Sequence, residues 1–288
     1  MNIRVRAANF LKFLTVVARF SVVAWNNTNL SRMFVACFQN DSEQTQLELE
    51  RLTRKQTAMV GFYEEFKAFN YLLAEEGRSS ISQEEQYPCL DDRTEQTGFD
   101  RHYIYHPAWA ARVIAARNPE HHVDISSTLH FATILSAFVK VEFFDFRKAP
   151  LTLSNLTSNE ADLTQLPFRS DAIKSLSCMH VIEHIGLGRY GDPIDIDGDK
   201  KAARELSRVL APDGDLLVVV PVGRSRIQFN AHRIYSHEQV IEMFPDLILV
   251  EHALIPDGEA EDGLIENPDS KLISSQSYGC GCYVFSKR

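Results

Sequence analysis

Paired cysteine motifs are absent from this sequence. Its five cysteines (Cys37, Cys89, Cys178, Cys280 and Cys282) are odd in number, and none belongs to a C-x-x-C pair. A disulfide framework or a zinc site normally shows such pairing, so we expect neither, no metal, and a reducing cytoplasmic location. Cys178 lies in an apolar stretch and is expected to be a small core residue.

The sequence also lacks an excess of positive charge. It has 30 basic and 39 acidic residues, for a net charge of −9. A general nucleic-acid binder needs basic surface to neutralise phosphates, so nucleic acid is excluded as the expected partner. The charge is uneven, because residues 1–40 contain five basic and no acidic residues. A hydrophobic content of 44% excludes wholesale disorder.

No uninterrupted apolar run of membrane-spanning length occurs near the N-terminus. The apolar stretch 7–25 is broken by Lys12 and Arg19. On a helix these two side chains would share one narrow stripe on an otherwise apolar surface. Such a helix in residues 1–40 could lie on anionic lipid at the inner face of the membrane, or pack on the protein's own core. Both interpretations stay open.

Residues 41–100 form a second region. Apolar residues recur at spacings of three and four between Leu49 and Leu73, which predicts a helix. This helix could mediate a homodimer or simply cover one face of a domain. Residues 76–100 are polar and rich in turn formers, which favours a loop or lid.

Residues 101–288 alternate between short apolar runs and amphipathic segments. This pattern predicts an open, mostly parallel α/β sheet with seven strands and an α-helical N-terminal extension. Asp199 is expected to cap the helix 200–210, and a Pro-Asp-Gly turn is expected after it. The seven strand candidates are 122–127, 140–146, a short third segment before Asp162, 172–181, 215–221, 247–255 and 280–288.

Acidic residues follow the first three strands. Asp124 and Asp145 are 21 residues apart, a spacing that places a carboxylate at the tip of the second strand, where it can accept both ribose hydroxyls of an adenosine. Asp162, in the turn after the third strand, can accept from an adenine amino group, and Leu163 offers apolar surface nearby. His180, near the end of the fourth strand, completes the cofactor-binding candidates.

Two further groups supply candidates for catalysis and substrate binding. Glu183 and His184 follow the fourth strand, where His184 could act as a general base or the pair could only order the loop. A second group follows the fifth strand, with His232 as a further catalytic candidate. Guanidinium groups there suit a phosphate or carboxylate, such as that of a sugar nucleotide, although solvated surface arginines are an open alternative. The substrate-binding candidates are Arg226, Asn230 and Arg233.

The segment HYIYHP at 102–107 alternates histidine and tyrosine. It could line the mouth of a substrate site or form a half-buried strand. Neither interpretation is excluded by the sequence.

The motifs LPF, EHI, RVLAPDG and VVVP follow one another in an order and spacing that resembles the class I S-adenosylmethionine-dependent methyltransferases. More narrowly, SLSCMHVIEHIGLGRYGDP and FNAHRIYS are similar to an uncharacterised family of nematodes and bacteria whose members often accompany surface-polysaccharide genes. The resemblance implies a Rossmann-like sheet whose last strand is antiparallel, with S-adenosylmethionine as cofactor. It also implies O-methylation of a glycan or glycan precursor.

One departure from that family concerns the turn after the first strand. The expected glycine-rich G-x-G turn is replaced by Ser126, Ser127 and Thr128. The serine hydroxyls could donate to a cofactor that sits differently, or they could merely cap the next helix. In a third interpretation the site has lost the cofactor, and the protein is a binding or scaffold component at the membrane surface.

Overall fold

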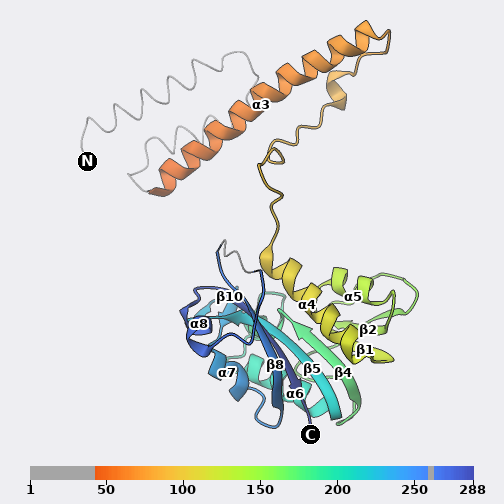
Figure 1. The fold of residues 1–288 in the computed structure, drawn as a ribbon, viewed down its shortest axis with the longest axis vertical. Coiled ribbons are helices and arrows are strands. Elements are labelled where there is room, and N and C mark those ends of the chain that lie inside the picture. Colours follow the sequence, from red (N-terminus) through yellow and green to blue (C-terminus); the bar gives the residue numbers. More distant parts are fainter. Residues whose placement is uncertain (1–42, 259–262) are drawn as a thin grey trace, which may run out of the picture. The chain divides into compact units, whose positions relative to one another are not determined.

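A computed structural model describes residues 43–258 and 263–288. The predictions for residues 1–40 therefore lie outside the described residues. The chain divides into one unit that ends at Gly98 and a second unit, Phe99–Arg288 (Figure 1). Among the described residues, no helix is both long and apolar enough to cross a membrane.

In the described part of the first unit, from residue 43 to Gly98, the main element is a long helix. Helix α3 (Glu43–Glu75) confirms the helical periodicity, and the 3₁₀ turn η1 (Gln83–Glu85) interrupts the polar segment after it. Arg93 donates two hydrogen bonds to the carboxylate of Glu65, at 2.8 and 2.9 Å, which ties this segment back to the helix.

The second unit is built on an eight-stranded sheet with the order β3-β2-β1-β4-β5-β10-β8-β9. Strands β1 to β5 pair in parallel, whereas β10 is antiparallel to both β5 and β8. This is a Rossmann-like, mostly parallel sheet whose last strand is antiparallel, as predicted. The strands are β1 (His121–Ile125), β2 (Lys140–Asp145), β3 (Leu156–Glu160), β4 (Ile173–Met179), β5 (Leu210–Val222), β8 (Ile248–Ile255), β9 (Ile265–Glu266) and β10 (Gly279–Ser286).

The predicted strand count of seven is wrong by one. The additional strand is β9, two residues in the segment between β8 and β10, which pairs with β8 at the sheet edge. The same segment forms helix α8 (Ser270–Ser275). A separate hairpin, β6 (Arg226–Gln228) with β7 (His232–Ile234), follows β5.

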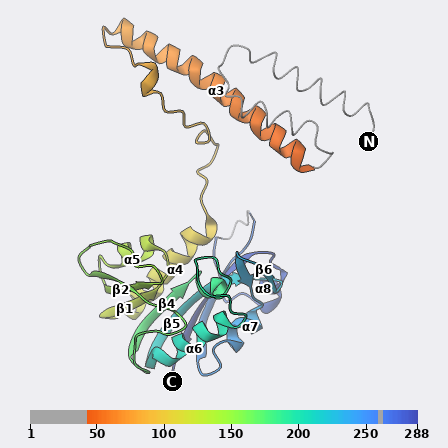
Figure 2. The same ribbon diagram turned by 180° about the vertical axis from the view of Figure 1, so that it is seen from behind.

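Apolar side chains form a core on each face of the sheet. Helices α4 (Arg101–Arg117) and α5 (Leu129–Leu135) cover one face, where Trp109 and Phe131 belong to the same core as Leu217. Helices α6 (Gly198–Val209), α7 (His237–Glu242) and α8 cover the other face, where Leu206 and Phe244 are buried (Figure 2). Cys178 is fully buried in this second core, as predicted.

Three local predictions are corrected by the structure. HYIYHP belongs to α4 and is not a strand; its helix is capped by the Asp100 carboxylate, which accepts from the Tyr103 amide. Asp199 lies inside the first turn of α6 rather than at its N-cap and accepts a 3.1 Å hydrogen bond from the Tyr235 hydroxyl. The Pro-Asp-Gly segment lies within β5, which begins at Leu210 and shifts register there.

Candidate functional site

The strand order reverses between β1 and β4, which are neighbours although the chain runs from β1 outward to β2 and β3 before it returns. Open α/β sheets bind ligands beyond the carboxyl ends of the strands at such a point. Ser126 follows β1 and His180 follows β4, and both have a φ of 56°. Non-glycine residues in the left-handed region are frequent at functional sites, so this edge of the sheet is the candidate site.

A cavity of about 240 Å³ lies at this edge, and we call it the carboxylate cavity. Asp145 at the end of β2 and Asp162 after β3 line it together with Ser126, Leu163 and His180. The remaining lining residues are Phe146, Arg147, Ala161, Thr164, Val181, His184, Ile185, Gly186, Tyr190, Asp192, Pro193, Asp195 and Gly198.

The two carboxylates of strands β2 and β3 are held by their own turns. Asp145 Oδ1 accepts from the amide of Arg147 at 2.8 Å. Asp162 Oδ1 accepts from both the amide and the hydroxyl of Thr164, each at 2.7 Å. These bonds fix the carboxylates on the cavity wall, where they can accept hydrogen bonds from a bound polar ligand.

The three residues that replace the glycine-rich turn have separate roles. Ser126 adopts the backbone conformation that glycine usually provides, and its amide donates to Phe144 O at 2.7 Å. The buried Ser127 hydroxyl accepts from the amide of Met179 at 3.1 Å. Thr128 caps α5 by accepting from the Phe131 amide, so the interpretation that the two serines cap this helix is wrong.

Asp124 and Ser127 were predicted to bind the cofactor, but neither lines the cavity. Asp124 is fully buried, and its Oδ1 accepts a 2.5 Å hydrogen bond from the hydroxyl of Ser177 on β4, which lies 2.9 Å from His122 Nε2. Burial raises the pKa of Asp124 to about 7. The acid at the end of β1 therefore belongs to a polar network inside the sheet.

A second hollow of about 530 Å³, the histidine pocket, shares His180 and His184 with the carboxylate cavity. Its side chains come from α4, the loop after β4, the β6–β7 hairpin and the segment before β10. The residues that line it are Tyr103, His180, Glu183, His184, Arg189, Asn230, Ala231, His232 and Tyr278.

His184 is oriented by a backbone carbonyl. Its Nδ1 lies 2.6 Å from Ala231 O, which can only accept, so Nδ1 carries the proton and Nε2 has the free lone pair. Nε2 lies 3.7 Å from Glu183 Oε1. Burial lowers the pKa of His184 and keeps the ring neutral. This arrangement provides a base whose protonated form a carboxylate would stabilise.

Glu183 is almost fully buried, at 1% exposure. Burial raises its pKa, but the 2.9 Å hydrogen bond from His180 Nδ1 and the nearby imidazoles outweigh that effect and hold the pKa below its usual value. Glu183 is therefore a buried carboxylate that orients one imidazole and faces another.

The predicted substrate-binding residues separate into two groups. Asn230 lines the histidine pocket, as does His232, the second catalytic candidate. Arg233 and Arg226 do not line it. Arg233 is 5% exposed and donates to Ile185 O at 2.7 Å. It also pairs with Asp199 at 3.5 Å, so it supports the loop after β4 and is not available to a substrate. The Arg226 guanidinium donates to Arg224 O at 3.0 Å within the hairpin.

Sequence reasoning missed part of the histidine pocket. Tyr103 belongs to HYIYHP, and its place in the wall of the histidine pocket agrees with the alternative that this segment lines the mouth of a substrate site. Tyr278 and Arg189 carried no recognisable signal, because an isolated tyrosine or arginine in a loop is common and its position depends on tertiary packing.

Residues 154–251 match the model of a family described as "Caenorhabditis protein of unknown function, DUF268", about a third of the chain. No curated protein matches the chain.

Several solved structures are similar to it. The YcgJ protein of Bacillus subtilis is 15% identical with a TM-score of 0.46, over 64% of this chain and 98% of that chain. The 1,6-didemethyltoxoflavin-N1-methyltransferase of Burkholderia thailandensis is 11% identical with a TM-score of 0.46, over 64% and 79%. The N-methyltransferase NodS of Bradyrhizobium japonicum is 16% identical with a TM-score of 0.45, over 68% and 92%.

Proposed function

We propose that this protein is an S-adenosylmethionine-dependent methyltransferase that methylates a hydroxyl of a glycan or glycan precursor. One observation carries the proposal. Ser126, Asp145 and Asp162, from the ends of three different strands, line one cavity at the point where the strand order reverses. A nucleoside needs such a set of groups, because Asp145 can accept from its ribose hydroxyls and Asp162 from its base amino group.

The turn after β1 supports cofactor binding despite its missing glycines. The left-handed φ of Ser126 preserves the backbone path of a glycine turn, and its side chain donates to Phe144 O at 3.2 Å. Only the Cβ and hydroxyl of one serine are added to the cavity wall. We therefore favour retention of the cofactor over a protein that has lost it.

In this proposal the acceptor binds in the histidine pocket, where tyrosine and histidine rings offer faces to a sugar and Asn230 and Arg189 offer donors. When bound, S-adenosylmethionine would supply an electrophilic methyl group to the acceptor hydroxyl and would leave as S-adenosylhomocysteine, with the electron pair of the broken carbon–sulfur bond on sulfur. His184 Nε2 takes the hydroxyl proton, and Glu183 stabilises the resulting imidazolium.

Calorimetric titration with S-adenosylmethionine and S-adenosylhomocysteine tests the cofactor. We expect binding to both and a rise in melting temperature; no heat and no stabilisation at millimolar ligand would contradict the proposal. Methyl-labelled cofactor with a panel of monosaccharides, sugar nucleotides and oligosaccharides then tests the acceptor. Labelling of a nitrogen, carbon or sulfur atom would show that the acceptor class is wrong.

A further inference from the structure

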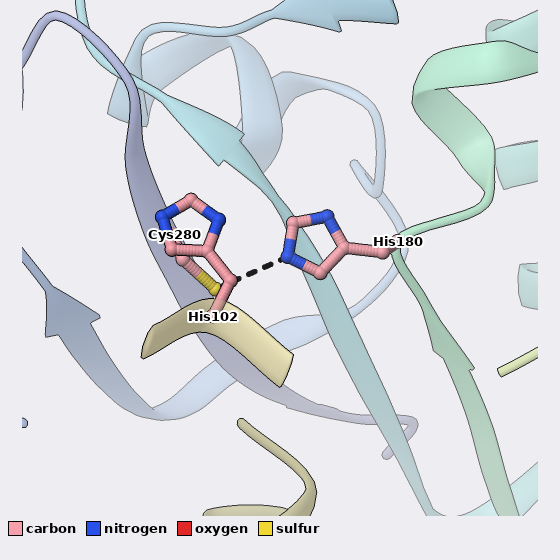
Figure 3. Close-up of side chains that lie close together, drawn as sticks. All are labelled: His102, His180 and Cys280. Atoms are coloured by element: carbon pink, nitrogen blue, oxygen red, sulfur yellow. Dashed lines mark hydrogen bonds between the residues drawn. The ribbon is translucent and has the colours of Figure 1, made fainter. Parts of the chain in front are cut away.

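Three side chains of metal-ligating type converge beside the histidine pocket: His102 in the first turn of α4, His180 after β4 and Cys280 in β10 (Figure 3). Their candidate ligand atoms all lie within 4.8 Å of one another. In the part of the chain that the structure describes, this is the one group of three such residues with that geometry. The C-x-x-C spacing rule could not reveal it, because the residues are up to 178 positions apart.

The distances suit a tetrahedral metal ion. With Zn–N bonds of about 2.1 Å and a Zn–S bond of about 2.3 Å, neighbouring ligand atoms lie about 3.4–3.6 Å apart. Cys280 Sγ already lies 3.4 Å from His180 Nε2. The rings of His102 and His180 are stacked, 5.4 Å apart between centroids and nearly parallel, so the His102 ring has to rotate before its lone pair meets the same ion as that of His180.

His180 is oriented as a metal ligand. Its Nδ1 donates to Glu183 Oε1 at 2.9 Å, which leaves the Nε2 lone pair directed toward Cys280. A carboxylate that holds the second nitrogen of a ligating histidine is a common feature of zinc sites, because it fixes the tautomer and the ring.

A buried carboxylate lies beside the three ligands. Glu183 is buried, and its Oε2 has no hydrogen-bond partner among the described residues. A divalent ion together with the Cys280 thiolate and the Glu183 carboxylate sums to zero charge.

We propose that His102, His180 and Cys280 bind one divalent ion of the Zn²⁺ class, with water at the fourth position. Two imidazoles and one thiolate favour zinc over magnesium or calcium, and three protein ligands leave the open position that is typical of catalytic zinc. Tyr103 and Tyr278, both of the histidine pocket, stack on His180 and His102 at 5.3 and 5.2 Å, so the ion borders that pocket. On binding, the Cys280 thiol releases its proton to solvent as the metal–sulfur bond forms.

The test begins with the purified full chain, stripped with a chelator and titrated with Zn²⁺ and, separately, Co²⁺. We expect about one ion per chain and, with Co²⁺, a thiolate-to-cobalt charge-transfer absorption. Cys280→Ala should remove this absorption and weaken binding at least about tenfold, whereas Cys282→Ala, on the same strand and equally buried, should change neither. Equal effects of the two cysteine variants, or absence of metal binding in the parent chain, would overturn the proposal.

Two further variants guard against unfolding as the explanation. His102→Gln changes a partly exposed side chain and should weaken Zn²⁺ at least about tenfold while circular dichroism stays unchanged. Glu183→Gln keeps the side-chain shape and should cost about 10- to 100-fold in metal affinity. His130→Gln, at an exposed position of α5, is the matched histidine control and should bind like the parent. Full metal affinity in His102→Gln would show that the ligand set is wrong.

Metal binding and methyl transfer are separable by the same preparations. S-adenosylhomocysteine is titrated into the stripped and the Zn²⁺-loaded chain. If the chain binds zinc but not the cofactor, the metal site is supported and the proposed function is contradicted. If the chain binds the cofactor but not zinc, the proposed function is supported and the metal site is contradicted.

Discussion

The carboxylate cavity and the histidine pocket share two imidazoles but are built differently. The carboxylate cavity takes Ser126, Asp145 and Asp162 from the ends of three neighbouring parallel strands, whose register fixes where each chain leaves the sheet. The histidine pocket takes its side chains from a helix, two loops and a hairpin that are distant in sequence. A cavity built on strand ends has positions that the sheet determines, whereas a pocket built on loops has positions that depend on packing.

The largest expected effect concerns the histidine pocket. His184→Ala should lower kcat by about 100- to 10,000-fold, because it removes the proposed base. Because His184 also lines the carboxylate cavity, affinity for S-adenosylhomocysteine should fall as well, but by less than about tenfold, which is far less than the loss in kcat. Single-turnover kinetics and calorimetry measure the two effects. The matched control is His232→Ala, whose ring lies 6.4 Å from His184 and should have the smaller effect on kcat; the opposite ranking would move the base to His232.

The next effect concerns the sheet interior behind the carboxylate cavity. The folded-state pKa of Asp124, about 7, exceeds its ordinary value of 3.8, so the folded protein holds this proton more tightly than the unfolded chain. The contribution of protonated Asp124 to the unfolding free energy is fully present below about pH 4 and is lost as the pH rises to about 7. Asp124→Asn stays neutral, so its unfolding free energy should gain roughly 3–4 kcal/mol relative to the parent between pH 4 and pH 8.

Urea unfolding at several pH values measures this difference. The pKa of Glu183 is lowered, so the contribution of this carboxylate to the unfolding free energy is lost as the pH falls. Both proteins contain Glu183, so its contribution cancels in the difference between them. Asp246→Asn, at an exposed position, should follow the parent at every pH. Parallel curves for the parent and Asp124→Asn would show that Asp124 is ionised in the folded state.

A smaller effect tests the wall of the carboxylate cavity. Asp145→Ala should weaken S-adenosylhomocysteine about 10- to 100-fold, because a carboxylate that accepts from ribose hydroxyls contributes about 1.5–3 kcal/mol. Glu160→Ala is the matched control: this exposed carboxylate pairs with Asp145 in the sheet register but does not line the cavity. Unchanged affinity in Asp145→Ala, measured by calorimetry, would move the ribose away from β2.

The smallest effect concerns the serine that replaces a glycine. Ser126→Gly loses the 3.2 Å hydrogen bond to Phe144 O but relieves a left-handed backbone, so its unfolding free energy should stay within about 1 kcal/mol of the parent. Ser126→Ala loses the same bond without that relief and should be less stable than Ser126→Gly by about 1 kcal/mol. Denaturant unfolding checks both values, and an equal loss in the two variants would mean that the backbone carries no strain.

Much of the fold was predictable from local pattern. The apolar runs that became β1, β2, β4, β8 and β10 have the length and turn residues of buried strands, and the periodicity before Leu73 gave α3. The errors fell where tertiary contacts outweigh local preference. HYIYHP alternates like a strand, yet it is helical because α4 packs against β8 and β10 and Asp100 caps it.

The candidate site also contains residues that local pattern predicts and residues whose surroundings depend on tertiary contacts. Asp145 ends β2 and Asp162 follows β3, and both line the carboxylate cavity, as their spacing predicts. Asp124, near the end of β1, is instead turned into the sheet, where Ser177 donates to it. Arg233 had the chemistry of a phosphate ligand, and only its burial against Ile185 O and Asp199 shows that it supports a loop. Spacing predicts where a residue lies along a strand; it does not determine which neighbour satisfies its charge.

The sequence by itself determined the sheet, its parallel character and the acids at the strand ends, because these follow from local hydrophobic pattern and connection length. The tertiary structure alone decided how the distant groups meet. It brings His102, His180 and Cys280 together and leaves the free lone pair of His184 on Nε2. It also places the Glu183 carboxylate beside two imidazoles. These contacts depend on three-dimensional packing, which places ligand atoms of residues up to 178 positions apart within 4.8 Å of one another.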